Sequence, residues 1–166
     1  MPFENIPHQN HLRKGRFSEQ GRAYAITKCA SQGISLIEDP RVTKSLIEAL
    51  FWVERQNVYS LGDFVVMPDH YHAVIVLAGT KSLSQIMKSI GSHTAREANR
   101  IMGSSGQFWQ RGYYDRAIRK TEDVEAIFEY IHHNPVRRGL VQVADQWPYS
   151  SMAPPYRKRI RWHNFL

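Results

Sequence analysis

The stretch that most constrains the fold is VVMPDHYHAVIVL, residues 65–77. Two apolar runs are separated by Pro68 and Asp69. This pair favours a tight turn, because proline presets one backbone dihedral and aspartate offers a side-chain acceptor to the backbone. The stretch therefore predicts a β-hairpin, and we take this hairpin as the centre of the fold.

The second strand of the hairpin opens with two histidines, His70 and His72. Side chains alternate between the two faces of a strand, so residues two apart point the same way, about 7 Å apart along the chain. Such a pair can converge on one metal ion if a third ligand comes from elsewhere. Val74 and Val76 continue the same face, which places the histidines at the rim of a buried surface. The alternative is that they form only the polar end of a hairpin.

The length and the charge limit the class of protein. A chain of 166 residues with 42% hydrophobic content is expected to form one domain with a sizeable core. The net charge of +7 favours a polyanionic partner, most commonly nucleic acid, although an anionic membrane surface would also fit the charge alone.

Cys29 is the single cysteine, so an intrachain disulfide is excluded. No apolar run approaches the roughly twenty residues of a membrane span and the N-terminus is polar, so we expect a cytoplasmic protein with no membrane partner.

Around the hairpin, the sequence predicts alternating strands and helices. Asp39-Pro40 and the pair Ser82 and Gln85 are typical helix starts. In chain order we expect a strand over residues 23–30, a helix over 39–55, the hairpin over 58–77, a helix over 82–99 and a strand over 108–118. This order is the split βαβ of the ferredoxin-like folds, an α+β arrangement with helices on one face of an antiparallel sheet. Residues 1–21 are expected to form a basic arm and residues 144–166 a basic tail.

A further helix is predicted after the fourth strand and is expected to carry functional residues. Thr121 is its expected cap, and Pro135 predicts its end at Asn134, because the residue before a proline is pushed out of the helical region. Tyr130 and Asn134 are four residues apart and share a face. Tyr130 should therefore border the core beside the apolar stripe, which consists of Val124, Ile127, Phe128 and Ile131.

Several separated motifs resemble those of the REP-associated tyrosine transposases, relatives of the single-tyrosine HUH transposases of insertion sequences. They are MPDHYH, WQRGYYDRAIR, EYIHHNPVRRGLV and WPYSS, and the resemblance extends over residues 24–151. HUH denotes two histidines around a bulky hydrophobic residue, and His70-Tyr71-His72 fits with a tyrosine in the middle. The resemblance implies Tyr130 as the nucleophile, with Asn134 joining the histidines as the third metal ligand. It gives no defined role to Asp115 or Arg116.

The resemblance implies a metal-dependent transposase, or nicking-joining enzyme, that acts on single-stranded DNA. Attack by the tyrosine oxygen would leave a 5′-phosphotyrosine and a free 3′-hydroxyl, so rejoining needs no nucleotide cofactor. Tyrosine is a weak nucleophile near neutral pH because its pKa is about 10, and a divalent ion would help by polarising the phosphate. The implied ion is Mg²⁺ or Mn²⁺, although imidazoles alone would bind zinc more tightly.

Basic and aromatic residues outside this site are candidates for DNA binding. Basic side chains neutralise phosphates, and aromatic rings stack on unpaired bases. In similar proteins the substrate is a short palindrome that folds as a hairpin on single-stranded DNA. The alternatives are a solvated helix face for the helical positions and a disordered charged segment for the tail. The candidates are Lys88, Arg96, Arg137, Arg138, Arg157, Lys158, Arg159, Arg161 and Trp162.

Two other functions also fit the sequence. The first is a domesticated hairpin-DNA-binding protein that does not cut. The second is a His-x-His metallonuclease that uses water and leaves no covalent adduct with DNA. His132 and His133 lie close to Tyr130 on the same predicted helix. They are interpreted either as groups that transfer a proton or as structural histidines. The sequence is compatible with a monomer and with a homodimer.

Overall fold

The structure is a computed structural model that describes residues 18–119 and 121–165. Within these residues the protein contains one four-stranded antiparallel sheet. The strands stand in the order β2-β3-β1-β4. They are β1 (Ala23–Cys29), β2 (Tyr59–Val66), β3 (His70–Leu77) and β4 (Tyr114–Ile118). The helices are α1 (Pro40–Arg55), α2 (Leu83–Met102), α3 (Thr121–Arg137) and the short α4 (Pro154–Arg157), with two 3-10 turns at Ala144–Gln146 and Trp162–Asn164. The predicted α+β order of strands and helices is confirmed. Most of the predicted N-terminal arm, residues 1–17, lies outside the described residues.

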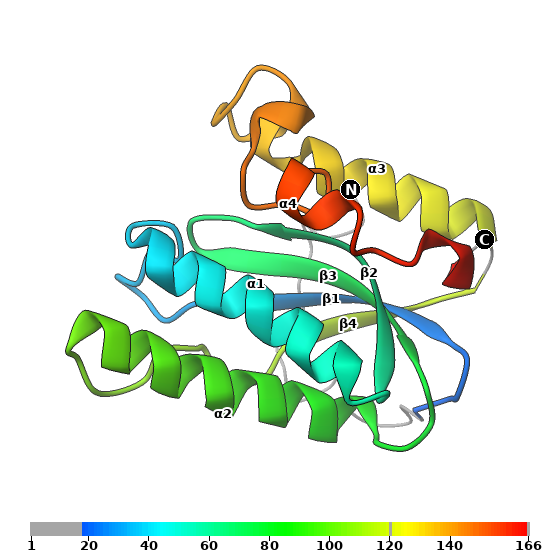
Figure 1. Ribbon diagram of the computed structural model, residues 1–166, viewed down its shortest axis with the longest axis horizontal. Helices are drawn as coiled ribbons and strands as arrows, with labels where there is room; N and C mark the ends of the chain where they lie inside the picture. The colour runs from blue at the N-terminus through cyan, green and yellow to red at the C-terminus, as the bar shows by residue number, and fades with distance from the viewer. Residues whose placement is uncertain (1–17, 120, 166) are drawn as a thin grey trace.

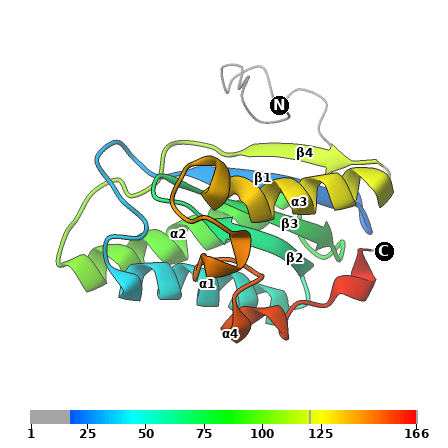
Figure 2. The same ribbon diagram turned by 90° about the horizontal axis from the view of Figure 1, so that it is seen from above.

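Helices cover both faces of the sheet. In Figures 1 and 2, α3 lies on the side of the sheet away from α1 and α2. Ile26 and Ile75 face the core beneath α1 and α2, whereas Ala25 and Val74 face the core beneath α3. Because side chains alternate along a strand, His70 and His72 lie on the same face as Val74. The two histidines and α3 therefore meet on one face of the sheet.

The hairpin at the centre of the sequence forms as predicted. Met67 donates its backbone N–H to the carbonyl of His70 at 2.8 Å, which closes the turn at Pro68 and Asp69. The register pairs Val65 with His72. The predicted helix starts are also confirmed: Asp39 accepts from the backbone N–H of Arg41 at 2.9 Å, and the reciprocal capping bonds of the α2 start are both present.

The predicted fourth strand is too long at its beginning, because residues 108–113 are irregular. Trp109 makes one isolated bridge with Ala30 and donates its indole N–H to Thr94 Oγ1 at 2.9 Å. The buried Lys28 amino group donates to the carbonyls of Gln110 and Gly112 at 2.6 and 2.5 Å. These carbonyls are satisfied by a side chain instead of a neighbouring strand, so the aromatic run forms a loop in which Phe108 and Trp109 are buried while Gln110 and Arg111 are exposed.

The predicted end of the last helix at Asn134 is wrong, because α3 continues through Pro135 to Arg137. Proline removes one N–H from the helical ladder, but the last turn is closed by later donors: Arg138 N–H bonds to the Asn134 carbonyl at 3.1 Å, and Leu140 N–H bonds to that of Pro135 at 2.9 Å. Gly139 then adopts a left-handed conformation, φ 68°, that commonly ends helices. The predicted cap involves the side chain of Thr121, which lies outside the described part of the structure.

The C-terminal segment is folded onto the domain as far as residue 165, so a disordered tail is excluded for residues 144–165. The ring of Tyr156 packs against Phe51 and Phe64, with centroid distances of 6.2 and 5.8 Å. Arg159 stacks over the Phe51 ring at 3.7 Å and pairs with Glu48 at 2.6 Å. Within the described residues, no helix is both long and apolar enough to cross a membrane.

This packing predicts that the C-terminal segment stabilises the fold. Tyr156→Ala removes a buried aromatic ring and is expected to lower the free energy of unfolding by about 3 kcal/mol. Arg157→Ala, at the exposed neighbouring position, should change it by less than about 0.5 kcal/mol. Urea denaturation followed by circular dichroism measures both values. Equal stability of the two variants would contradict the packing described here.

Candidate active site

The imidazoles of His70 and His72 lie side by side on β3. Their Nε2 atoms are 3.0 Å apart, and both residues are buried. The other ring nitrogen of each imidazole has a polar partner. Nδ1 of His70 lies 2.8 Å from Asp69 Oδ1, and Nδ1 of His72 lies 2.7 Å from Thr27 Oγ1. Such outer contacts fix the ring orientation of metal-binding histidines. Both Nε2 atoms are thereby directed at a common point.

Burial keeps this pair of imidazoles neutral. Desolvation lowers the pKa of His70, and the neighbouring Asp69 carboxylate opposes the effect only in part. Desolvation, together with the positive charge on His70 when protonated and on Arg137, lowers the pKa of His72 to about 3. A neutral imidazole is the form that binds a metal ion. At neutral pH, both histidines are therefore in the form required of ligands.

Helix α3 places Tyr130 beside His72, and Asn134 follows one turn later on the same helix. The ring of Tyr130 is half-buried, with its centroid 5.9 Å from that of His72. Asn134 is buried, with 5% of its surface exposed, which is unusual for an amide side chain. The guanidinium of Arg137 stacks over the Tyr130 ring at 3.8 Å and donates to the Tyr130 carbonyl at 3.1 Å. The orientation of the Tyr130 ring is thus set by its own helix.

The donor set that the sequence predicts for this site is two imidazoles and one amide. Among the described residues, no group of three His, Cys, Asp or Glu side chains is placed to hold a metal ion. A metal at His70 and His72 would therefore draw its third protein ligand from another residue type, and Asn134 is the amide buried on the facing helix. Such a set leaves coordination positions open for oxygen atoms of a substrate, and it is compatible with a divalent cation.

The sequence analysis missed Asp63, a carboxylate in β2 that is completely buried. Its Oδ2 lies 2.6 Å from Nε2 of His132, and its Oδ1 accepts a hydrogen bond from Ser151 Oγ at 2.8 Å. Burial raises the pKa of Asp63, and the contacts with His132 and Ser151 oppose that rise. The available signal was a single acid within the otherwise apolar strand LGDFVV. His133 instead is exposed, with Nδ1 3.0 Å from the Glu129 carbonyl.

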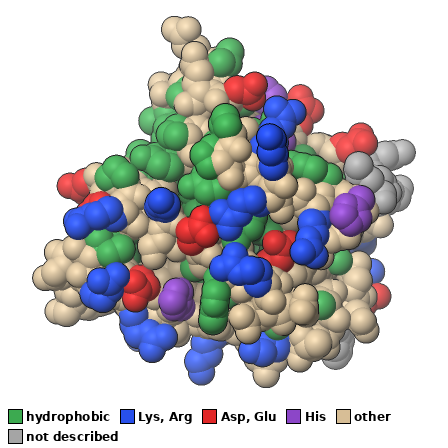
Figure 3. All heavy atoms as spheres, viewed as in Figure 1, with side chains coloured by type: hydrophobic (Ala, Val, Ile, Leu, Met, Phe, Trp, Pro, Cys, Tyr) green, Lys and Arg blue, Asp and Glu red, His purple; other side chains and the backbone are tan. Residues whose placement is uncertain are grey.

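The predicted DNA-binding residues fall into separate groups. Arg137 and Arg138 border the histidines, since Arg137 covers Tyr130 and Arg138 lies 3.8 Å from Asp69. Lys88 and Arg96 are exposed on α2, across the sheet from the histidines, and Figure 3 shows basic side chains along the edge where α2 runs. In the C-terminal segment, Arg157, Lys158 and Arg161 are exposed, Arg159 is paired with Glu48, and Trp162 packs against Phe128 of α3.

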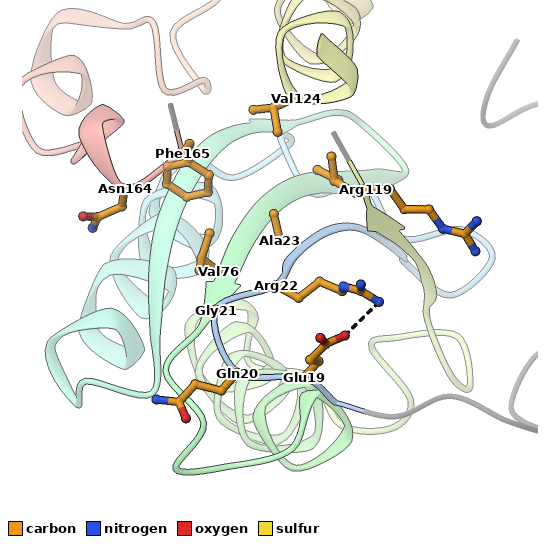
Figure 4. A pocket seen from close by; sticks show the side chains of 11 residues that line it. Glu19, Gln20, Gly21, Arg22, Ala23, Val76, Arg119, Val124, Asn164 and Phe165 are labelled. Atoms are coloured by element: carbon orange, nitrogen blue, oxygen red, sulfur yellow. Dashed lines mark ion pairs between the residues drawn. The ribbon is translucent and has the colours of Figure 1, made fainter. Parts of the chain in front are cut away.

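A pocket of about 340 Å³ opens at the opposite end of the strands from the histidines (Figure 4). Its lining includes Ala23 at the start of β1, whereas His70 pairs with Cys29 at the end of that strand. On its rim, Arg22 is paired with Glu19 at 2.9 Å. The pocket is therefore separate from the histidine site.

Two relatives and one solved structure are similar to this chain. The REP-associated tyrosine transposase of Escherichia coli K12 is 29% identical over 107 residues, which cover 64% of this chain and 62% of that protein. A putative REP-associated tyrosine transposase of Haemophilus influenzae is 28% identical over 96 residues, covering 52% and 54%. The matches therefore span less than two thirds of the length of these relatives. A solved structure of a REP-associated tyrosine transposase bound to a REP hairpin superposes with a TM-score of 0.69 at 25% identity, covering 82% of this chain and 79% of that chain.

The family model described as IS200-like transposase matches residues 21–134. The match covers more than half of the chain and includes the hairpin histidines, Tyr130 and, as its last residue, Asn134. On this evidence, the protein belongs to the family of IS200-like transposases.

Proposed function

We propose that this protein is a DNA strand transferase that cuts and rejoins single-stranded DNA beside a hairpin, with Tyr130 as nucleophile. The proposal is supported by the contact of Tyr130 with His72 in a pair of buried imidazoles, and by the buried Asn134 one turn further along the same helix. The choice of hairpin DNA is supported by the solved relative, which is bound to a REP hairpin. The net charge of +7 also suits a polyanionic substrate.

We further propose that His70, His72 and Asn134 hold one Mg²⁺ or Mn²⁺ ion. The two Nε2 atoms lie 3.0 Å apart, so both imidazoles could hold one ion. The buried Asn134 amide would supply an oxygen ligand. When bound, the ion supplies positive charge that polarises the scissile phosphate.

In the proposed reaction, the Tyr130 oxygen attacks the phosphorus atom of a phosphodiester. The new bond joins phosphorus to the tyrosine oxygen, and the bond from phosphorus to the 3′ oxygen breaks. The phenol proton is balanced by the proton that the departing 3′-hydroxyl gains. Rejoining is the reverse exchange, in which a 3′-hydroxyl attacks the phosphotyrosine and releases Tyr130. One ester replaces another in each step, so the reaction needs no nucleotide cofactor.

The arginines beside the site have a defined part in this scheme. Arg137 holds the Tyr130 ring from above, so the attacking oxygen is confined to a narrow range of directions. Its guanidinium and that of Arg138 also place positive charge next to the position that a phosphate must occupy. Holding the nucleophile and attracting the phosphate are thus both assigned to the last turn of α3 and the residue that follows it.

Replacement of the nucleophile tests the proposal most directly. With a hairpin oligonucleotide and Mg²⁺ or Mn²⁺, the wild type is expected to form a protein-DNA species that survives boiling in detergent, because a phosphotyrosine ester is covalent. Tyr130→Phe keeps the ring and its stacking but removes the attacking oxygen, so the adduct should vanish while hairpin affinity stays within about twofold. Denaturing gel electrophoresis measures the adduct, and Tyr149→Phe serves as a matched control.

Each alternative function predicts a different set of products on the denaturing gel. A water-using metallonuclease would cut the oligonucleotide without any adduct in the wild type, and a pure hairpin-binding protein would leave it uncut. A folded Tyr130→Phe protein that still formed the adduct would assign the chemistry to another residue.

The metal assignment predicts a separation of binding from chemistry. His72→Ala removes one ligand, so metal-dependent adduct formation is expected to fall at least a hundredfold while hairpin affinity changes little, because basic residues supply most of that affinity. His133→Ala, on the exposed side of α3, is the control and should retain activity. Full activity of His72→Ala in the presence of Mn²⁺ would contradict the site.

The assembly of the site from one chain predicts that a single subunit is sufficient for chemistry. Mixing Tyr130→Phe with His72→Ala protein should therefore not restore adduct formation, since neither chain has a complete site. Recovery of activity on mixing, measured on the same gels, would mean that two chains exchange α3.

A further inference from the structure

The proposed chemistry does not use the buried contact between Asp63 and His132. This contact joins β2 to α3, the helix that carries Tyr130. Asp63 lies within a β-bulge, where the pairing of β2 with β3 shifts between Leu61 and Phe64. Leu61 and Phe64 are three residues apart yet both face the core beneath α1 and α2. Regular alternation would put them on opposite faces. The bulge therefore changes the phase of the strand, and the Asp63 carboxylate meets His132 of α3.

His132 occupies the flank of α3 opposite the catalytic flank. At 100° per residue, His132 lies about 180° around the helix from the midpoint between Tyr130 and Asn134. Ile131 lies between the two flanks and is buried against the sheet, with 1% of its surface exposed. The helix thus rests on Ile131, places Tyr130 beside His72 on one side, and contacts Asp63 of β2 on the other.

We infer that Asp63 and His132 form a positioning pair that sets the rotation of α3 about its own axis, and thereby aims Tyr130 and Asn134 at the histidines. The inference rests on the proposed function, because it names what fixes the geometry of that same site. A rotation of 20° would move a group at the helix's outer radius by about 2 Å. Displacements of about 1 Å in a catalytic group can reduce rates by two orders of magnitude.

The other contacts of α3 are less able to set this rotation. Apolar packing through Val124, Ile127 and Ile131 is non-directional, whereas the 2.6 Å contact between the Asp63 carboxyl group and the His132 imidazole joins two particular atoms and is lost when the helix turns. Within the described part of the chain, neither Asp63 Oδ2 nor His132 Nε2 makes a hydrogen bond, so their approach to 2.6 Å is the polar contact of these two buried atoms. A rotation of α3 that separated them would remove this contact, which is unfavourable for buried polar atoms.

Ser151 makes Asp63 a fixed support for the helix. Its hydroxyl donates to Asp63 Oδ1 at 2.8 Å, and its backbone N–H bonds to the Phe64 carbonyl at 2.9 Å. Through Ser151, the WPYSS motif thereby fixes the position of the Asp63 carboxylate. This gives the motif a part in the reaction geometry although it lies outside the site.

The test uses the full chain and two readouts. Asp63→Asn keeps the shape of the side chain but removes its charge, and His132→Gln removes the imidazole. Each is expected to slow single-turnover adduct formation at least tenfold while the Kd for hairpin DNA stays within twofold. Each should also weaken Mn²⁺ binding severalfold, measured by calorimetry without DNA, because Asn134 moves with the helix. The double variant should be no slower than the slower single variant, since the two residues act as one unit.

Tyr59→Phe is the matched control. It removes a buried hydrogen bond of the same strand, from the Tyr59 hydroxyl to the Leu50 carbonyl at 2.6 Å, on the side of α1. It is expected to lower Tm while leaving the adduct rate and the Mn²⁺ affinity unchanged at temperatures well below Tm. An equal slowing in Tyr59→Phe would assign the effect to general destabilisation and overturn the inference.

The remaining outcomes are also decisive. Folded Asp63→Asn or His132→Gln protein with the wild-type rate and Mn²⁺ affinity would overturn the inference. If Asp63→Asn does not fold, His132→Gln decides alone, because its side chain is partly exposed, at 18%, and is more tolerant of change. If the wild type forms no adduct, the proposed function fails, and weaker Mn²⁺ binding in the variants would still support the positioning pair.

Discussion

The structure depends most on the pairing of β1 with its two neighbours. On one side, the register of β1 with β3 places Thr27 opposite His72, where its hydroxyl holds the imidazole. On the other side, β1 pairs with β4, the strand that leads into α3. One central strand thus orients a histidine and also sets the starting point of the helix that carries Tyr130. A slip of one residue in this register would turn Thr27 to the opposite face of the sheet.

Burial of the histidines has opposite effects on stability and on function. Removing two imidazoles from water is unfavourable unless their polar atoms are satisfied, and Asp69 and Thr27 satisfy one nitrogen of each. The same burial keeps His70 and His72 neutral, so their remaining nitrogens are suited to a cation. The positive charges nearby belong to Arg137 and Arg138, which are exposed. The site therefore separates neutral donors inside from charged groups at the rim.

Local signals in the sequence predicted much of the fold, whereas features decided by distant contacts were missed. The hairpin turn and the helix starts involve residues within a few positions of one another, so their chemistry is readable directly. The aromatic run at Trp109 has a strand-like composition, but Lys28 binds the carbonyls of Gln110 and Gly112, which lie 82 and 84 residues later in the chain. Pro135 indicated a helix end, yet Gly139 provides the actual one. Asp63 was overlooked because its partner, His132, comes from another element.

The geometry of the site consists of two rigid parts and one variable relation. The separation of His70 and His72 is determined within a strand, and that of Tyr130 and Asn134 within a helix, so local backbone geometry fixes both. What tertiary packing must still set is the placement of α3 over β3. Apolar contacts determine the distance between the two elements, because they are strong but non-directional. The proposed positioning pair supplies a contact that depends on this rotation, because Asp63 Oδ2 and His132 Nε2 lie 2.6 Å apart on the flank of α3 away from Tyr130.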